Sequence, residues 1–255
     1  GGNISIDSEK GIRLTVAEKD GFSEFHGAER TSIQKSEGSL HFKILKPERR
    51  LELAVEVISP RVEVQALQVA NIREGTVRHE HWLRYSFHNA GVKELGLIVP
   101  SSTMGLVVDG PDIAAVHGPD RDGLLRVELN RKWFDREYPL SLRYERRFDK
   151  EQGRVDIHGV RPRSVEVYKA WVCVLGTDRV EVSPVEIPAE MLQVDPRGIP
   201  TFFGASSFSQ AAYAYAGTSD ASTLVFSARR HELASHLQAD IEQATLTSVL
   251  SEQGG

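Results

Sequence analysis

Two histidines separated by one residue, His79 and His81, are the sharpest candidates for chemistry in this sequence. In a β-strand, residues i and i+2 point to the same face, so both imidazoles could approach one metal ion such as zinc. A third ligand would come from His41, His88 or a carboxylate on a facing strand. The flanking residues are charged, so the alternative interpretation is a solvated strand face. We favour that alternative and keep metal binding as a hypothesis.

A second candidate is a group of aromatic residues, Trp133, Phe134 and Tyr138, in a charged stretch near the expected end of a strand. Flat aromatic faces stack on the apolar faces of sugar rings, so this group could form a glycan platform. Alternatively, Trp133 and Tyr138 pin the turn onto the edge of the fold. We favour this second interpretation.

The serine, cysteine and glycine motifs of the sequence predict no catalytic centre. The sequence has no Gly-x-Ser-x-Gly elbow, and Gly204-Ala205-Ser206-Ser207 lacks the second glycine. Cys173 lies within an apolar run and is interpreted as a small core residue rather than a nucleophile. No phosphate-binding glycine loop or dinucleotide fingerprint occurs, so we expect no cofactor. An enzyme, metal-dependent or not, is the less favoured class.

The charge pattern argues against nucleic acid as a partner. The formal net charge is −5, from 31 Lys and Arg against 36 Asp and Glu. The basic residues are scattered singly, whereas phosphate binding requires a basic stripe.

These candidate residues lie on or beside predicted β-strands. Apolar and polar residues alternate with a period of two, which is typical of half-buried strands, and polar turn clusters such as Asp120-Arg121-Asp122-Gly123 separate them. This pattern predicts an all-β fold, an antiparallel β-sandwich built as one large or two packed sandwiches, with short helices at 188–192 and near 207–216. The predicted strands include 12–16, 40–44, 50–57, 61–67, 82–87, 124–129, 140–148 and 165–175.

The polar segment 149–162 is the best candidate for a domain boundary, which would divide the chain into a sandwich over 3–150 and a second sandwich, or a continuation of the first, over 151–255. The stretch 194–223 has the least regular alternation and is either a functional loop or a connector. Residues 237–249 fit a strand or a helix. We favour a strand, whose exposed edge would let the chain self-associate.

From about residue 61 onward, the order of these features resembles β-sandwich modules of very large extracytoplasmic proteins of planctomycete-type bacteria. The stretches that carry the resemblance are Trp82-Leu83-Arg84-Tyr85-Ser86-Phe87, Ala90-Gly91-Val92-Lys93-Glu94-Leu95 followed by Val99-Pro100, Tyr138-Pro139-Leu140-Ser141-Leu142-Arg143-Tyr144-Glu145, and Val174-Leu175-Gly176-Thr177-Asp178-Arg179-Val180-Glu181-Val182. The resemblance implies a β-sandwich and an exported location, in the periplasm or on the cell surface. It supplies no catalytic residue.

Two hypotheses about function follow. The first is a non-catalytic structural or interaction module of a larger exported bacterial protein, whose partners are neighbouring β domains. The second is a carbohydrate-binding or carbohydrate-processing domain. The first residues have neither the basic region nor the apolar core of a signal peptide, so we expect any signal or anchor to lie outside this sequence.

Overall fold

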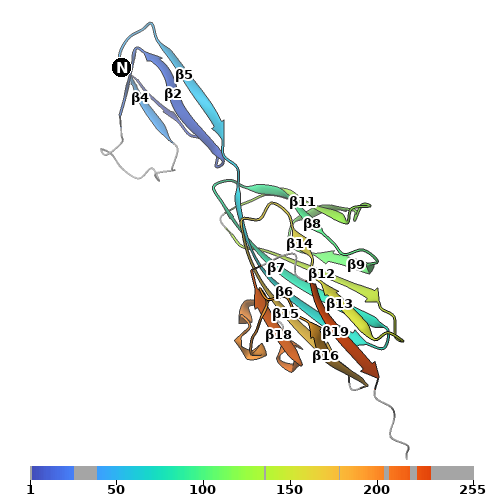
Figure 1. The fold of residues 1–255 in the computed structure, drawn as a ribbon. Helices are drawn as coiled ribbons and strands as arrows, with labels where there is room; N and C mark the ends of the chain where they lie inside the picture. The colour runs from blue at the N-terminus through green and yellow to red at the C-terminus, as the bar shows by residue number, and fades with distance from the viewer. Residues whose placement is uncertain are drawn as a thin grey trace, which may run out of the picture.

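The computed structural model describes residues 2–25, 39–134, 136–177, 179–203, 207–218 and 223–230. Their regular structure is strands with three short 3-10 helices, which confirms the predicted all-β sandwich (Figure 1). The largest sheet has seven strands, in the spatial order β17 (Leu192–Gln193), β18 (Tyr213–Gly217), β15 (Val167–Gly176), β6 (Arg61–Arg73), β7 (Thr76–His88), β12 (Tyr138–Arg147) and β9 (Met104–Asp109). Its strands pair antiparallel, except that β15 and β6 run parallel.

Two smaller sheets cover one face of the seven-stranded sheet. One is a four-stranded sheet of β10 (Ile113–His117), β11 (Leu124–Trp133), β8 (Val92–Ile98) and β14 (Arg161–Pro162). The other is a three-stranded sheet of β13 (Arg154–His158), β19 (Thr223–Arg230) and β16 (Val180–Glu186). Alternate residues of β6 point to the covered face and enter two hydrophobic clusters, because side chains alternate along a strand. Val64 and Ala66 of β6 pack with the four-stranded sheet, whereas Ala70 and Ile72 pack with the three-stranded sheet. The seven-stranded sheet takes strands from both sides of segment 149–162.

The opposite face of the seven-stranded sheet carries a third hydrophobic cluster. It includes Trp171 and the fully buried Cys173, which confirms the interpretation of this cysteine as a core residue. Phe203 and Phe208 pack there from a segment containing the 3-10 helices η1 (Pro196–Gly198), η2 (Thr201–Phe203) and η3 (Ser207–Gln210). The short helical element predicted at 188–192 is a single turn, in which the Met191 N–H donates to the Pro188 carbonyl at 2.9 Å. The chain then continues as β17.

The first five strands form a separate unit at one end of the molecule (Figure 1). One sheet consists of β1 (Asn3–Ile6), β4 (Leu40–Ile44) and β3 (Phe22–Glu24), and the other of β2 (Ile12–Asp20) and β5 (Arg50–Val57). The unit contacts the body through Lys10, whose Nζ lies 4.0 Å from the centre of the Phe134 ring, and through a 3.5 Å ion pair between Glu9 and Lys132.

The predicted turn at residues 120–123 is present and shows why its residue types are needed. Asp120 Oδ1 accepts hydrogen bonds from the N–H groups of Asp122 and Leu124, both at 2.9 Å. Gly123 has a φ of +79°, and a Cβ there would meet the Val99 carbonyl oxygen at 2.6 Å. Among the described residues, no helix has the length and apolar character needed to cross a membrane. The predicted strand at 237–249 lies outside the described residues.

Candidate functional site

His79 and His81 lie on the covered face of β7, where their side chains are 0% and 3% exposed. The interpretation as a solvated strand face is therefore wrong. The Gln68 amide nitrogen donates to His79 Nδ1 and to the His158 carbonyl, both at 3.1 Å. His81 Nε2 lies 3.0 Å from the Tyr144 hydroxyl. These side chains form a buried polar layer between the two hydrophobic clusters of the covered face.

Burial sets the protonation of both imidazoles. It lowers the pKa of His81 to about 3. Burial also lowers the pKa of His79 well below its usual value, and the charges of His81, Arg146 and His158 lower it further. Both rings are therefore neutral at physiological pH, and His79 Nε2 has no hydrogen-bond partner among the described residues.

Neither of the two additional histidines considered as metal ligands lies in this layer. His41 is in the N-terminal unit, where it bonds to Ser5 at 2.9 Å, and His88 is at the exposed end of β7. The described part of the chain holds no group of three His, Cys, Asp or Glu residues that could bind a metal. Metal binding at His79 and His81 stays a prediction.

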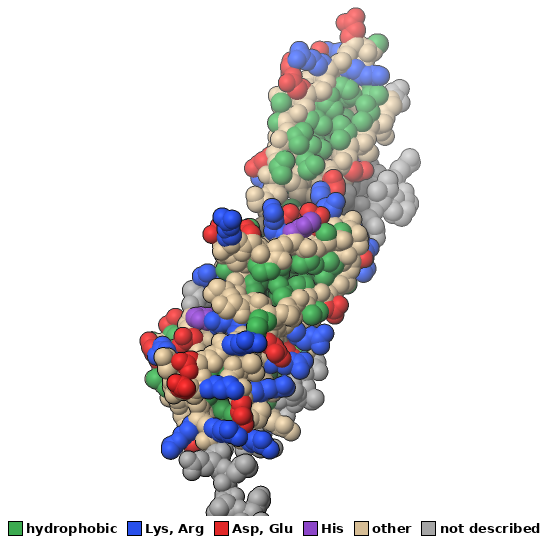
Figure 2. Space-filling model, turned by 90° about the vertical axis from the view of Figure 1, so that its right-hand side faces the viewer, with side chains coloured by type: hydrophobic (Ala, Val, Ile, Leu, Met, Phe, Trp, Pro, Cys, Tyr) green, Lys and Arg blue, Asp and Glu red, His purple; other side chains and the backbone are tan. Residues whose placement is uncertain are grey.

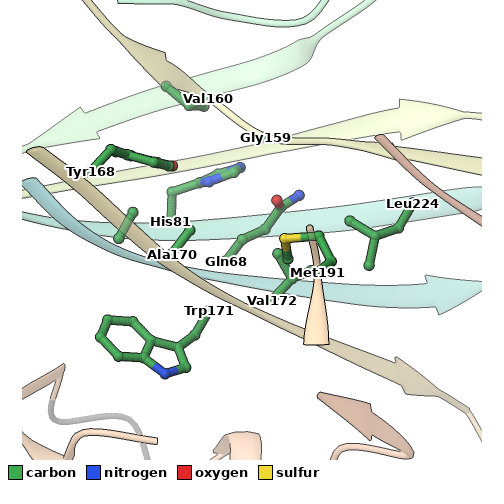
Figure 3. Close-up of a pocket in the computed structure, with 11 residues that line it drawn as sticks. Gln68, His81, Gly159, Val160, Tyr168, Ala170, Trp171, Val172, Met191 and Leu224 are labelled. Carbon is green, nitrogen blue, oxygen red and sulfur yellow. The ribbon is translucent and has the colours of Figure 1, made fainter. Parts of the chain in front are cut away.

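A small cavity of about 20 Å³ lies beside His81 and Gln68. Figure 3 shows both side chains pointing to the same side of the sheet, whereas Trp171 points to the opposite side. The volume suits a single water molecule, for which the amide and imidazole are polar partners. The cavity is therefore too small for an organic ligand.

Trp133 and Tyr138 meet at the edge of the body, as the pinning interpretation requires. Their rings pack edge to face at 5.0 Å, and the Trp133 indole N–H donates to the Arg136 carbonyl at 3.0 Å. The buried Tyr138 donates its hydroxyl to the Pro111 carbonyl at 2.9 Å. Phe134 instead faces Lys10 of the N-terminal unit. Sugar binding by this group stays a prediction.

An aromatic groove of about 480 Å³ was missed by the sequence reasoning. It lies on the outer face of the seven-stranded sheet, between η2 and the end of β9. Trp82 and Arg84 of β7, Ser141 of β12 and Asp109 of β9 contribute to it, and Phe202 forms part of its rim. Two features of the sequence could have indicated this groove. They are the adjacent phenylalanines in the irregular segment 194–223 and the tryptophan at an outward position of β7.

A second exposed feature is the N-terminal apolar face, defined by Ile12 and Leu14 of β2 with Leu53, Val55 and Val57 of β5. Cross-strand pairing of Ile12 with Val57 and of Leu14 with Val55 places these side chains on one face of the two-stranded sheet. Val55 and Val57 are 62% and 79% exposed. Figure 2 shows hydrophobic side chains gathered on this end of the molecule.

Comparisons with known proteins do not identify the function. No protein-family model matches the sequence, and neither does any curated protein. Structural similarity exists to a two-domain M1 zinc metallopeptidase with bound L-tryptophan, at 9% identity and a TM-score of 0.36, and to the M1 zinc metallopeptidase from Deinococcus radiodurans, at 10% identity and a TM-score of 0.34. Both matches cover 66% of this chain and 42% of the peptidase chain.

Proposed function

We propose that this chain is a non-catalytic interaction module of a larger exported bacterial protein, in which a neighbouring β domain packs on the N-terminal apolar face. The observation that carries the proposal is the exposure of Val55 and Val57, which lie in a regular strand and are 62% and 79% exposed. The exported bacterial setting rests on the resemblance of the sequence to extracytoplasmic β-sandwich modules.

The opposite face of β2 and β5 carries charged side chains. Arg13 and Glu56 form an ion pair at 3.0 Å there, as expected for a face that stays in water. The two-stranded sheet is thus amphipathic, and a contiguous exposed apolar face of this kind marks an interaction surface. Burying Val55 and Val57 against a partner would contribute about 3 kcal/mol. That contribution is enough to favour docking of a domain tethered in the same chain.

The test is calorimetric titration of this chain with the neighbouring β domains of its parent protein. Val57→Lys should weaken binding at least about tenfold, because it places a charge in the contact. Val185→Lys is the matched control, since Val185 is a strand residue with 60% exposure in the body. Binding that is absent, or that both variants weaken equally, would contradict the proposal.

A further inference from the structure

The floor of the aromatic groove is one row of paired residues on neighbouring strands. Asp109 of β9 pairs with Ser141 of β12, which pairs with Trp82 of β7. Directly paired residues point to the same face of a sheet with their Cβ atoms about 5 Å apart. A carboxylate, a hydroxyl and an indole therefore stand side by side on a rigid surface.

The rim of the groove is held by an aromatic anchor. Phe203 is 8% exposed and packs edge to face on Trp171 at 5.8 Å. This contact fixes η2 against the sheet and leaves the adjacent Phe202 45% exposed at the groove. The Arg84 guanidinium lies 4.1 Å from the centre of the Phe202 ring and orients it further.

Of the two charged side chains in the groove, Arg84 is paired within the described part of the chain and Asp109 is not. Arg84 forms an ion pair with Glu137. The Asp109 carboxylate has no ion pair or hydrogen bond within the described ranges, and its residue is exposed. The groove thus offers a free acceptor for hydroxyl groups and repels a ligand that carries its own negative charge.

We propose that the aromatic groove binds a neutral oligosaccharide, with a sugar ring on Trp82, the exposed part of Phe202 beside it at the rim, and sugar hydroxyls donating to Asp109 and Ser141. Aromatic faces match the apolar faces of sugars, and the groove has the size and the mixture of apolar and polar groups of a ligand site. This site is independent of the N-terminal apolar face.

A proline-rich peptide is the competing occupant, because such peptides also bind aromatic grooves. Proline has no N–H group, so a run of prolines would cover Asp109 and Ser141 without replacing their bonds to water. An acceptor left unpaired in this way costs binding free energy. A sugar ring supplies several hydroxyl donors at the same place, which favours the oligosaccharide.

The test is calorimetric titration of the whole chain with neutral hexasaccharides of glucose, mannose or xylose units, with an oligogalacturonate, and with a proline-rich peptide. We expect a neutral hexasaccharide to bind, and Phe202→Ala to weaken it about tenfold. Asp109→Asn should weaken it about fivefold. Phe25→Ala is the matched control, because Phe25 is 39% exposed in the N-terminal unit, and it should leave the affinity unchanged.

Because Phe202 is exposed, we expect its alanine variant to keep the fold, and circular dichroism of each variant checks this. Binding of a neutral hexasaccharide that Phe202→Ala weakens about tenfold and that Phe25→Ala preserves supports the proposal. Tighter binding of the oligogalacturonate or of the proline-rich peptide would overturn it. So would the absence of binding by every neutral hexasaccharide at millimolar concentration.

Discussion

Acid should destabilise this protein through the buried polar layer. The pKa of His81 is lowered to about 3 in the folded chain, whereas an unfolded chain has a histidine pKa of about 6.5. Between these two values the unfolded chain binds one more proton at this position than the folded chain. The free energy of unfolding therefore falls by about 1.4 kcal/mol for each pH unit below 6.5.

At about pH 4.5 the loss from His81 reaches about 3 kcal/mol, a large share of the 5 to 15 kcal/mol typical of folded domains. The pKa of His79 is also lowered, first by burial, so His79 further reduces the free energy of unfolding in acid. Above about pH 6.5 both rings are neutral in either state, so neither contributes a pH dependence there.

The assay is urea unfolding followed by circular dichroism at about pH 7.5 and about pH 4.5. His81→Gln should reduce the pH dependence by roughly one proton, about 1.4 kcal/mol per pH unit. Equal pH dependence in the unsubstituted chain and in His81→Gln would show that burial of His81 does not cause the acid sensitivity.

Three further predictions concern packing. Burial raises the pKa of the Cys173 thiol to about 12, so a thiol reagent should label it only after denaturation, and rapid native labelling would show that the core assignment is wrong. Trp133→Ala should cost about 2 to 3 kcal/mol in thermal unfolding, against less than about 1 kcal/mol for Phe134→Ala; equal costs would contradict edge pinning. Tyr144→Phe should cost about 1 to 2 kcal/mol of unfolding free energy, because His81 loses a partner at 3.0 Å, and no change would argue against that bond.

The strands were predictable because their signal is local. Alternation between apolar and polar residues identified 40–44 and 50–57 with the same bounds as β4 and β5. The burial of the histidines was also encoded locally. His79 and His81 share the odd-numbered face of β7 with the buried Leu83 and Tyr85, so extending the alternation backwards from Trp82 would have placed them inside.

The groove and the parallel pairing were not predictable from local patterns. β15 pairs with β6 across roughly a hundred residues of chain, and no short-range signal specifies that partner or its direction. The groove likewise depends on Phe203 packing against Trp171 of another strand, which positions Phe202 near Trp82. Such contacts arise from the tertiary fold and have no periodic signature in the sequence.

The most direct test of the interaction module is hydrogen exchange of the β5 amides, measured in this chain alone and in the parent protein. We expect slower exchange at Leu53, Val55 and Val57 in the parent protein, because a neighbouring domain covers the N-terminal apolar face. Exchange in β16, which carries the similarly exposed Val185, should stay the same. Identical exchange of β5 in both proteins would show that no neighbouring domain covers the N-terminal apolar face.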